Sequence, residues 1–226
     1  MYIIQFSLGI GKDGLAGYPL IDVYLTGKEL KLAAEVDASV SDFMTTARLY
    51  CSGLNFTFNP HRMILNKVTD CYLTREDGER IEIQDDQLYR VVTDLYTGQM
   101  LGSVMEMSYG LLKIEPKDKD GNPIENLEDQ AIMEGDKELK AWDAIARYMK
   151  SFDDTDGNGI SNVPEYYETT HGRKVVDESR NVIDLVKNPN KFSVMIVGIV
   201  LVLIMIIILL VVLIRKLIKK RRRKKK

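Results

Sequence analysis

The feature that most constrains this chain is an uninterrupted apolar run near its C-terminus. The run covers the 23 residues from Phe192 to Ile214, and only Ser193 among them is even weakly polar. About 20 apolar residues are enough for a helix to cross the ~30 Å hydrocarbon layer of a bilayer. Inside lipid the run must be helical, because only a helix satisfies its own backbone polar groups there. The sequence therefore predicts a single transmembrane helix over 192–214.

A strongly basic segment follows this run. Ten of the twelve residues from 215 to 226 are Lys or Arg. Short basic flanks of a membrane helix stay on the cytoplasmic side, and each such charge near an anionic leaflet contributes about 1 kcal/mol. We therefore expect residues 215–226 to be a cytoplasmic tail in contact with anionic lipid of the inner leaflet. Everything before Phe192 is then expected to be extracytoplasmic, at the surface of the cell membrane.

The N-terminal sequence contains no export signal that would explain this orientation. Neither a charged segment, a long apolar stretch nor a small-residue cleavage site precedes the domain sequence, and a signal peptide requires all three. We therefore expect the natural chain to begin before Met1, with a signal peptide and further domains.

The charge balance separates the tail from the rest of the chain. The whole sequence has 31 Lys and Arg against 33 Asp and Glu, ten of these cations lie in the tail, and no acidic residue lies beyond residue 191. The remainder therefore carries a net charge of −12. Nucleic-acid binding requires surface cations that displace counterions from phosphates. We therefore expect no nucleic-acid partner.

Residues 1–152 have the composition of one globular domain of the α+β class, with a mixed sheet and packed helices. Runs rich in β-branched and aromatic residues, bounded by turn residues, predict strands. The predicted strands cover 18–25, 48–58, 64–73, 80–83, 88–96 and 108–114. The sequence DKDGNP predicts a turn over 118–123, because Asp, Asn, Gly and Pro favour turns.

Two helices are expected in the same domain. Thr26 and Glu29 have the spacing of a capping box, which predicts a helix over 30–36. A second, amphipathic helix is expected at the end of the domain, because five apolar residues recur there at helical spacing. These residues are Leu139, Trp142, Ile145, Met149 and Phe152. Residues 153–191 are polar and broken by Gly and Pro, and we expect them to form a stalk.

Four segments of the domain come in the order and spacing of a known module. They are TGKELKLAAE (26–35), SGLNFTFNP (52–60), LNKVTD with a following DG turn (65–78) and LYRVVTDLY (88–96). This pattern resembles the C-terminal domain of the 5′-nucleotidase family over roughly residues 5–114. The resemblance implies that a metallophosphoesterase domain, found N-terminally in full-length members, would complete the protein.

The family resemblance implies that divalent metals would bind in that other domain. There, Asp, Asn and His side chains hold two metals that activate water for attack on phosphate. This sequence has only two histidines, His61 and His171, and contains none of the metal-ligand motifs of the family. We therefore expect no catalytic residue and no phosphatase activity in this chain, whose family is a hydrolase of phosphoric monoesters.

The C-terminal domain of the family supplies the nucleoside pocket, where aromatic rings stack on the base. The resemblance places Tyr96 at the stacking aromatic and Asp94 at the preceding Asn of the family motif, and Phe6 lies near the other stacking position. These three are the expected substrate-binding residues. The sequence over 97–110 replaces the loop that follows in the family.

Two functions remain open on the sequence. The first is a nucleotide- or nucleoside-recognition domain of a membrane-anchored, extracytoplasmic 5′-nucleotidase-type phosphohydrolase in nucleotide catabolism. The second is a catalytically silent, membrane-anchored surface interaction module, which the altered sequence after Tyr96 keeps open.

The stalk contains a pattern of oxygen-bearing residues that fits an EF-hand-like calcium loop. Asp154, Asp156, Asn158 and Glu165 occupy the first, third, fifth and twelfth positions of the loop, with glycines at its turn. We expect these four residues to bind Ca²⁺. The alternative is a hydrophilic, turn-rich linker.

Cys51 and Cys71 are the two cysteines of the chain. They lie in neighbouring predicted strands, equidistant from residue 61. A hairpin centred there would place them opposite each other, at a separation that accepts a disulfide. A disulfide and two half-buried thiols are both compatible with this pattern.

Overall fold

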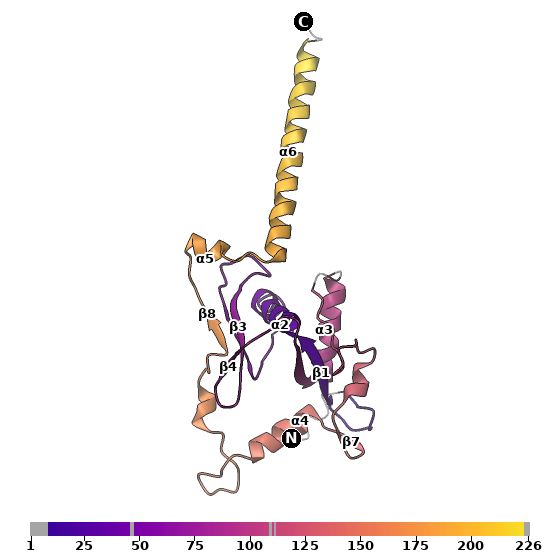
Figure 1. Cartoon of the computed structure of the whole chain (residues 1–226), viewed down its shortest axis with the longest axis vertical. Helices are drawn as coiled ribbons and strands as arrows, with labels where there is room; N and C mark the ends of the chain where they lie inside the picture. Colours follow the sequence, from indigo (N-terminus) through magenta and orange to yellow (C-terminus); the bar gives the residue numbers. More distant parts are fainter. Residues whose placement is uncertain (1–8, 46–47, 109, 111, 224–226) are drawn as a thin grey trace. The chain divides into compact units, whose positions relative to one another are not determined.

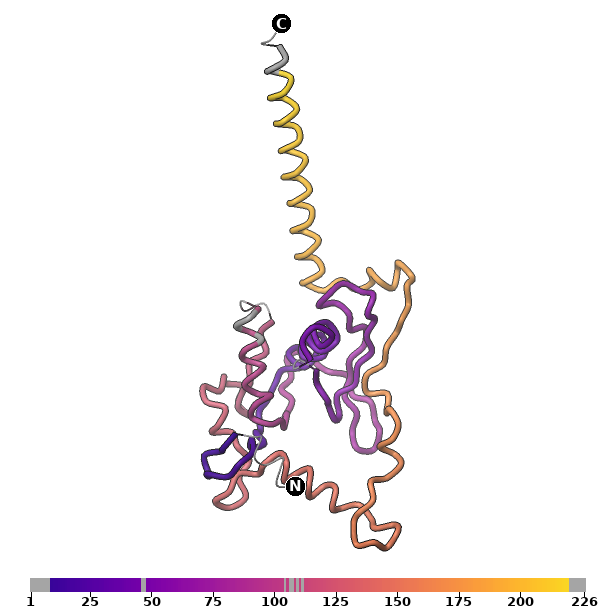
Figure 2. The backbone as a smooth tube through the Cα atoms, turned by 180° about the vertical axis from the view of Figure 1, so that it is seen from behind, coloured from indigo at the N-terminus to yellow at the C-terminus, as the bar shows by residue number. Residues whose placement is uncertain are grey.

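The computed structural model describes residues 9–45, 48–108, 110 and 112–223. The chain has the α+β fold that the sequence predicts (Figures 1 and 2). It divides into two compact units. Unit 1 comprises Met1–Ala34, Leu49–Phe56 and Cys71–Lys174, and unit 2 comprises Glu35–Arg48, Thr57–Asp70 and Val175–Lys226. Each unit is thus assembled from segments that are separated in the sequence.

An antiparallel strand pair lies at the centre of unit 1. It is formed by β1 (Leu20–Thr26) and β5 (Leu88–Asp94), with Val23 opposite Val91. Successive side chains of a strand point to opposite faces of the sheet, so that only every second residue of β1 is buried. The buried residues of β1 are Ile21, Val23 and Leu25. The predicted strands over 18–25 and 88–96 are confirmed, although β5 ends two residues early.

Helix α2 (Gly27–Val40) starts directly after β1. Its first turn is the capping box that the sequence predicts, in which Thr26 and Glu29 hydrogen-bond each other's backbone N–H groups. Leu30 and Ala33 are one helical turn apart and therefore share a face. This face contributes to a buried cluster in unit 1 that consists of Leu25, Leu30, Ala33 and Ile114.

A second sheet has four strands in the order β4-β3-β2-β8. Three of them confirm predicted strands: β2 (Leu54–Phe58), β3 (Val68–Thr74) and β4 (Arg80–Glu82). Strands β3 and β4 pair antiparallel, with Leu73 opposite Ile81.

The fourth strand, β8 (Lys174–Val176), comes from the segment expected to be a stalk. The Phe56 N–H donates to the Arg173 carbonyl, and the Asp177 N–H donates to the Phe58 carbonyl, each over 2.9 Å. From the first bond to the second, the residue numbers rise in both segments, from 56 to 58 and from 173 to 177. Strand β8 is therefore parallel to β2, and the sheet is mixed. The segment predicted as a stalk thus contains a strand of the sheet, which the sequence does not show because a three-residue strand leaves almost no periodic pattern.

Helix α3 (Leu95–Met107) occupies the region where the sequence predicts the end of a strand and then a loop. Gly98 allows this helix to approach β1 closely, because a Cβ atom there would lie 2.6 Å from Ile21 Cδ1. The strand predicted over 108–114 is also wrong for its described residues, 108, 110 and 112–114, which are not in a strand. Both errors concern short apolar runs, for which periodicity does not distinguish helix from strand.

The C-terminal part of unit 1 consists of short elements. They are η2 (Leu127–Gln130), β6 (Met133–Glu134), β7 (Lys137–Glu138), α4 (Ala141–Lys150) and η3 (Glu165–Glu168). Helix α4 confirms the predicted amphipathic helix. Its Trp142 indole N–H donates to the Ala16 carbonyl at 3.0 Å, whereas Ile145 and Met149 on the same helix remain exposed.

In unit 2, Glu35 ties the second half of α2 to the segment that leads into β3. Its carboxylate accepts hydrogen bonds from the Lys67 N–H at 2.6 Å and the Val68 N–H at 2.8 Å. The Ser39 hydroxyl adds a third bond at 2.9 Å. Glu35 is buried, and a buried carboxylate needs such donors.

Unit 2 ends with α5 (Val182–Val186) and α6 (Lys191–Arg223). Helix α6 is continuous (Figure 2), and at 1.5 Å per residue its 33 residues extend over about 50 Å. Among the described residues it is the one helix that is long and apolar enough to cross a membrane. Its apolar side chains from Val194 to Ile214 are largely exposed.

Candidate functional site

Two tyrosine rings meet at the start of α3 in unit 1. Tyr96 lies in the first turn of this helix, and its ring centroid is 5.7 Å from that of Tyr18, with the rings tilted by 38°. The Leu95 N–H donates to the Pro19 carbonyl at 2.9 Å, which joins the two segments. Tyr96 is 43% exposed, so part of its surface is available for a ligand.

A cavity of about 290 Å³ lies next to this aromatic pair. Its wall includes Tyr18 and Leu95, the latter being the neighbour of Tyr96 in the chain. Apolar, amide and charged side chains are combined in this wall. The wall also includes Ile10, Lys12, Gln99 and Glu138. Small-molecule sites combine apolar walls with a few polar groups, and this cavity offers side chains of both kinds.

A buried ionic cluster fixes the segment that forms one side of the cavity. The Lys140 ammonium group lies 2.8 Å from Asp13 Oδ1 and 2.5 Å from Glu138 Oε2. The Lys12 N–H donates to Glu138 Oε1 at 3.2 Å. Gly11 leaves the space for this cluster, since a Cβ atom there would lie 2.1 Å from both Glu138 Oε2 and Lys140 Nζ. Removing one partner of such a buried pair is strongly destabilising.

Asp94 lies at the C-terminal end of β5 and caps α3. Its Oδ1 accepts a hydrogen bond from the Thr97 N–H at 3.0 Å, and its Oδ2 accepts one from the Thr97 hydroxyl at 2.7 Å. An Asp in this position satisfies one of the free N–H groups at a helix start. Asp94 thereby holds the turn that carries Tyr96. Phe6, the third expected substrate-binding residue, lies outside the described residues.

Sequence reasoning missed Tyr18, Lys12 and Gln99 as candidates. Tyr18 was visible in the sequence only as the first residue of a predicted strand. Its proximity to Tyr96, 78 positions later, follows from the pairing of β1 with β5, which the sequence pattern does not specify.

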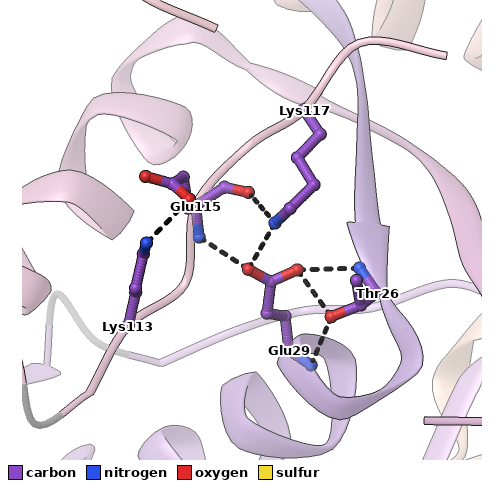
Figure 3. Close-up of polar contacts among 5 residues, drawn as sticks. All are labelled: Thr26, Glu29, Lys113, Glu115 and Lys117. Carbon is purple, nitrogen blue, oxygen red and sulfur yellow. Dashed lines mark hydrogen bonds and ion pairs between the residues drawn. The ribbon is translucent and has the colours of Figure 1, made fainter. Parts of the chain in front are cut away.

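The carboxylate of Glu29 in unit 1 accepts four hydrogen bonds (Figure 3). Its Oε1 accepts from the Lys117 ammonium group at 2.6 Å and from the Glu115 N–H at 3.1 Å. Its Oε2 accepts from the Thr26 N–H at 2.8 Å and the Thr26 hydroxyl at 2.7 Å. The side chains of Lys117 and Glu29 are only 14% and 11% exposed.

These bonds determine the ionisation of Glu29. Burial alone raises its pKa, but the hydrogen bonds from Lys117, Thr26 and the Glu115 N–H outweigh burial and hold the pKa of Glu29 below its usual value. A carboxylate has about four acceptor positions, and all four are used here. The Glu29 cluster therefore stabilises the fold and has no free acceptor for a ligand.

The structure brings together three of the four residues of the predicted calcium loop. Asp154 accepts from the Gly157 and Gly159 N–H groups, each over 2.8 Å, and Asn158 donates its side-chain amide to Asp156 at 2.9 Å. The bond from Gly159 is the main cause that lowers the pKa of Asp154, against a smaller effect of burial. Glu165 instead begins η3.

Within the described part of the chain, no three His, Cys, Asp or Glu side chains form a group that could hold a metal ion. Asp154, Asp156 and Glu165 thus do not converge in this structure. Calcium binding by the loop stays a prediction. His171 stacks on Tyr166 with ring centroids 3.8 Å apart. Cys51 and Cys71 are both half-buried.

The aromatic pair lies within a range of the chain that matches a family of known proteins. A family model described as the 5′-nucleotidase C-terminal domain matches residues 16–107, a range that includes Tyr18, Asp94 and Tyr96. Curated proteins give no match.

Two solved structures are similar to parts of the chain. The crystal structure of a 5′-nucleotidase precursor from Thermus thermophilus has 18% sequence identity and a TM-score of 0.47, over 72% of this chain and 26% of that one. The NAD nucleotidase of Haemophilus influenzae has 21% identity and a TM-score of 0.33, over 45% of this chain and 19% of that one. The chain therefore spans about a quarter or less of the length of these proteins. Residues 16–107 of this chain are therefore similar to the C-terminal domain of 5′-nucleotidases.

Proposed function

We propose that unit 1 recognises a nucleotide or nucleoside for a 5′-nucleotidase-type phosphohydrolase of nucleotide catabolism. The observation that carries this proposal is the partly exposed Tyr18–Tyr96 pair beside the cavity of about 290 Å³, inside the range that matches the family.

Tyr96 provides a partly exposed aromatic surface on which a base can stack. Stacking of a nucleobase on an aromatic side chain contributes about 1–3 kcal/mol. The Gln99 amide, in the cavity wall, offers both a donor and an acceptor to the edge of a base. Asp94 acts as a positioning residue, because it caps the helix turn that carries Tyr96.

The catalytic step belongs to a different domain in this proposal. A metallophosphoesterase domain would hold the divalent metals that activate water, and unit 1 would present the nucleoside part of the substrate to it. Helix α6 would anchor the protein in the cell membrane as a single span. The basic residues after Ile214 would face the cytoplasm, because basic flanks stay on that side. The domain would then be extracytoplasmic.

A catalytically silent surface module is the second candidate. It is favoured by the exposed apolar residues of α4, Ile145, Tyr148 and Met149, since exposed apolar patches mark interaction sites when they are contiguous. Such a module would not bind nucleosides, and the following experiment separates the two candidates.

The test uses the single tryptophan as a reporter. Trp142 Cδ1 would lie 2.5 Å from a Cβ atom at Gly17, and Gly17 lines the cavity. Adenosine, guanosine, cytidine and AMP are titrated into the full chain in detergent while Trp142 emission is followed. We expect saturable quenching by at least one of them. Tyr96→Ala should weaken binding about 5- to 150-fold, which is the loss of one stacking contact.

Two variants serve as controls. Tyr96→Phe keeps an aromatic ring and should bind as the parent chain does. Tyr50→Ala removes a largely exposed tyrosine of unit 1 that does not line the cavity, and it should have no effect. Equal binding by the parent chain and Tyr96→Ala, or no response to any of the four compounds, would contradict the proposed recognition.

A further inference from the structure

Helix α5 exposes its apolar side chains instead of burying them. Val182, Ile183 and Val186 are 71%, 69% and 65% exposed, and their spacing places them on one face of the helix. The opposite residues, Asp184 and Leu185, are half-buried against unit 2. A surface helix of a soluble protein has the reverse arrangement, with its apolar stripe toward the core.

Arg62 imposes this orientation on α5. Its guanidinium group is buried and donates to the carbonyls of Asp184 at 2.5 Å and Lys187 at 2.6 Å. Its Nε donates to the Asn66 carbonyl at 2.7 Å. Carbonyls at the C-terminal end of a helix have no partner within the helix, so a cation is a favourable donor to them. The apolar face therefore points outward because the polar backbone end of α5 is fixed inward.

Helix α6 leaves unit 2 without a flexible connection. Phe192, in its first turn, is only 4% exposed. Asn190 caps the helix by accepting from the N–H groups of Phe192 and Ser193, each over 3.0 Å. The Asn190 amide also donates to the Leu65 carbonyl. The base of α6 is thus fixed to the loop that contains Arg62.

This attachment fixes where a membrane would meet unit 2. Exposed apolar side chains of α6 begin at Val194, two residues after the buried Phe192. A helix needs about 20 residues to cross the ~30 Å hydrocarbon layer, and the headgroup region adds roughly 5–7 Å on each side. The hydrocarbon boundary therefore falls within the first turns of α6, and the surface of unit 2 around Phe192 lies at the level of the headgroups.

We propose that α5 is a second membrane contact, with Val182, Ile183 and Val186 inserted at the boundary between headgroups and acyl chains. Figure 1 shows α5 beside the base of α6, and both belong to unit 2. Ile64, which is also exposed, lies in the loop that holds both elements. Lys187 and Lys191 flank the apolar residues, as basic residues do in interfacial helices. The inference rests on the proposed membrane anchor.

The occupant of this apolar face is a lipid bilayer because α5 lies beside the base of α6 (Figure 1), where the exposed apolar side chains of the proposed anchor begin. Unit 2 would then rest on the outer leaflet and would not be held away from it by a stalk. Nucleotide recognition by unit 1 is not required for this contact.

The test measures depth in the bilayer with introduced tryptophans. The full chain is reconstituted in phosphatidylcholine vesicles whose acyl chains are brominated either near the headgroup or near the chain end, because bromine quenches tryptophan only at short range. Three variants are compared: Ile183→Trp on α5, Val176→Trp on β8 and Leu203→Trp within α6. Each replaces an exposed apolar side chain, so the fold should tolerate it, which circular dichroism checks. Emission of Trp142 in the parent chain is subtracted.

We expect Ile183→Trp to lose its added emission with bromine near the headgroup, Leu203→Trp to lose it with bromine near the chain end, and Val176→Trp to keep it with both lipids. Quenching at Leu203 with none at Ile183 would overturn the contact of α5 while the membrane anchor stands. Equal quenching at Val176 and Ile183 would overturn it too, because the whole surface would then be immersed. No quenching at Leu203 would remove the anchor and this inference with it.

Discussion

Two carboxylates of unit 1, Glu29 and Asp154, each accept several hydrogen bonds, but only Glu29 receives some of them from residues far away in the sequence. Glu29 receives bonds from Lys117 and Glu115, which lie 88 and 86 residues away. Asp154 receives bonds from Gly157 and Gly159, which lie three and five residues away. Glu29 is buried and Asp154 is exposed.

The difference indicates which carboxylate supports the fold. Bonds between distant residues form only when the chain folds, so their free energy adds to the stability of the whole unit. Bonds within a short loop can form locally while the rest of the chain is open, and local openings of this kind have low free energies. We therefore expect Glu29 and its partners to control global stability, and Asp154 to control only the order of its own loop.

The largest effect on the free energy of unfolding is expected from replacing Lys117, the buried partner of Glu29. Lys117→Met should lower the free energy of unfolding by about 3 kcal/mol, because it leaves a buried carboxylate without its cation. Urea unfolding of the full chain in detergent, followed by circular dichroism, measures this change. Lys113→Met is the matched control, since Lys113 lies 2.9 Å from Glu115 but is largely exposed. Exposed ion pairs contribute about 0–1 kcal/mol. Equal losses in the two variants would mean that burial of the pair is irrelevant.

A smaller effect is expected from pH. The folded-state pKa of Glu29 lies below its ordinary value of 4.5, so ionised Glu29 adds stability that is complete above the unfolded-state pKa. This contribution is lost as the pH falls through the folded-state pKa. The stability advantage of the parent chain over Glu29→Gln should therefore be constant above a pH of about 5 and should shrink below 4.5. The urea midpoints of unfolding of the two chains, measured at several pH values on both sides of these limits, give this difference in stability.

The exposed carboxylate of Asp154 provides the matched case for comparison with Glu29. The pKa of Asp154 is also lowered, mainly by the Gly159 N–H, but its bonds are local. Asp154→Asn should leave the pH profile of global unfolding unchanged. A profile altered as strongly as that of Glu29→Gln would break the distinction between the two carboxylates.

The smallest effect is expected from Ca²⁺ binding to the loop that contains Asp154. If Asp154, Asp156, Asn158 and Glu165 bind Ca²⁺, the affinity should be on the order of 10⁻⁴–10⁻³ M, as in extracellular modules. Millimolar Ca²⁺ should slow proteolysis between Phe152 and Tyr166 and leave the melting temperature of the domain unchanged.

Replacement of Asp154 and Asp156 by Ala should abolish this protection. Calorimetry without a calcium heat at millimolar ion, together with unchanged cleavage, would reduce the loop to a linker. A calcium-dependent rise in the melting temperature would instead show that Glu165 closes on the loop and couples it to the fold.

Local patterns in the sequence predicted a large part of this fold. The sequence alone predicts the capping box at Thr26 and Glu29, a strand over 18–25, the helix α4 from the spacing of its apolar residues, and the apolar run of α6. Each of these patterns depends on residues that are close in the sequence, where hydrophobic periodicity distinguishes helices from strands. The order of the motifs likewise predicts the resemblance to the family over roughly 5–114, and the family model matches residues 16–107.

Tertiary structure decided the features that depend on distant partners. The pairing of Tyr18 with Tyr96, the neutralisation of Glu29 by Lys117 and the insertion of β8 beside β2 have no local pattern. Helix α3 was misassigned because Asp94 and the close approach at Gly98 select a helix where the sequence alone fits a strand end.

The clearest division between sequence and structure lies at the C-terminal end of the chain. The sequence by itself determined that 192–214 is apolar enough to span a membrane, because hydrophobicity is a sum over neighbouring residues. It could not show that Val182, Ile183 and Val186 face outward. That orientation depends on Arg62, more than 100 residues away in the chain, which holds the carbonyl end of α5 inward.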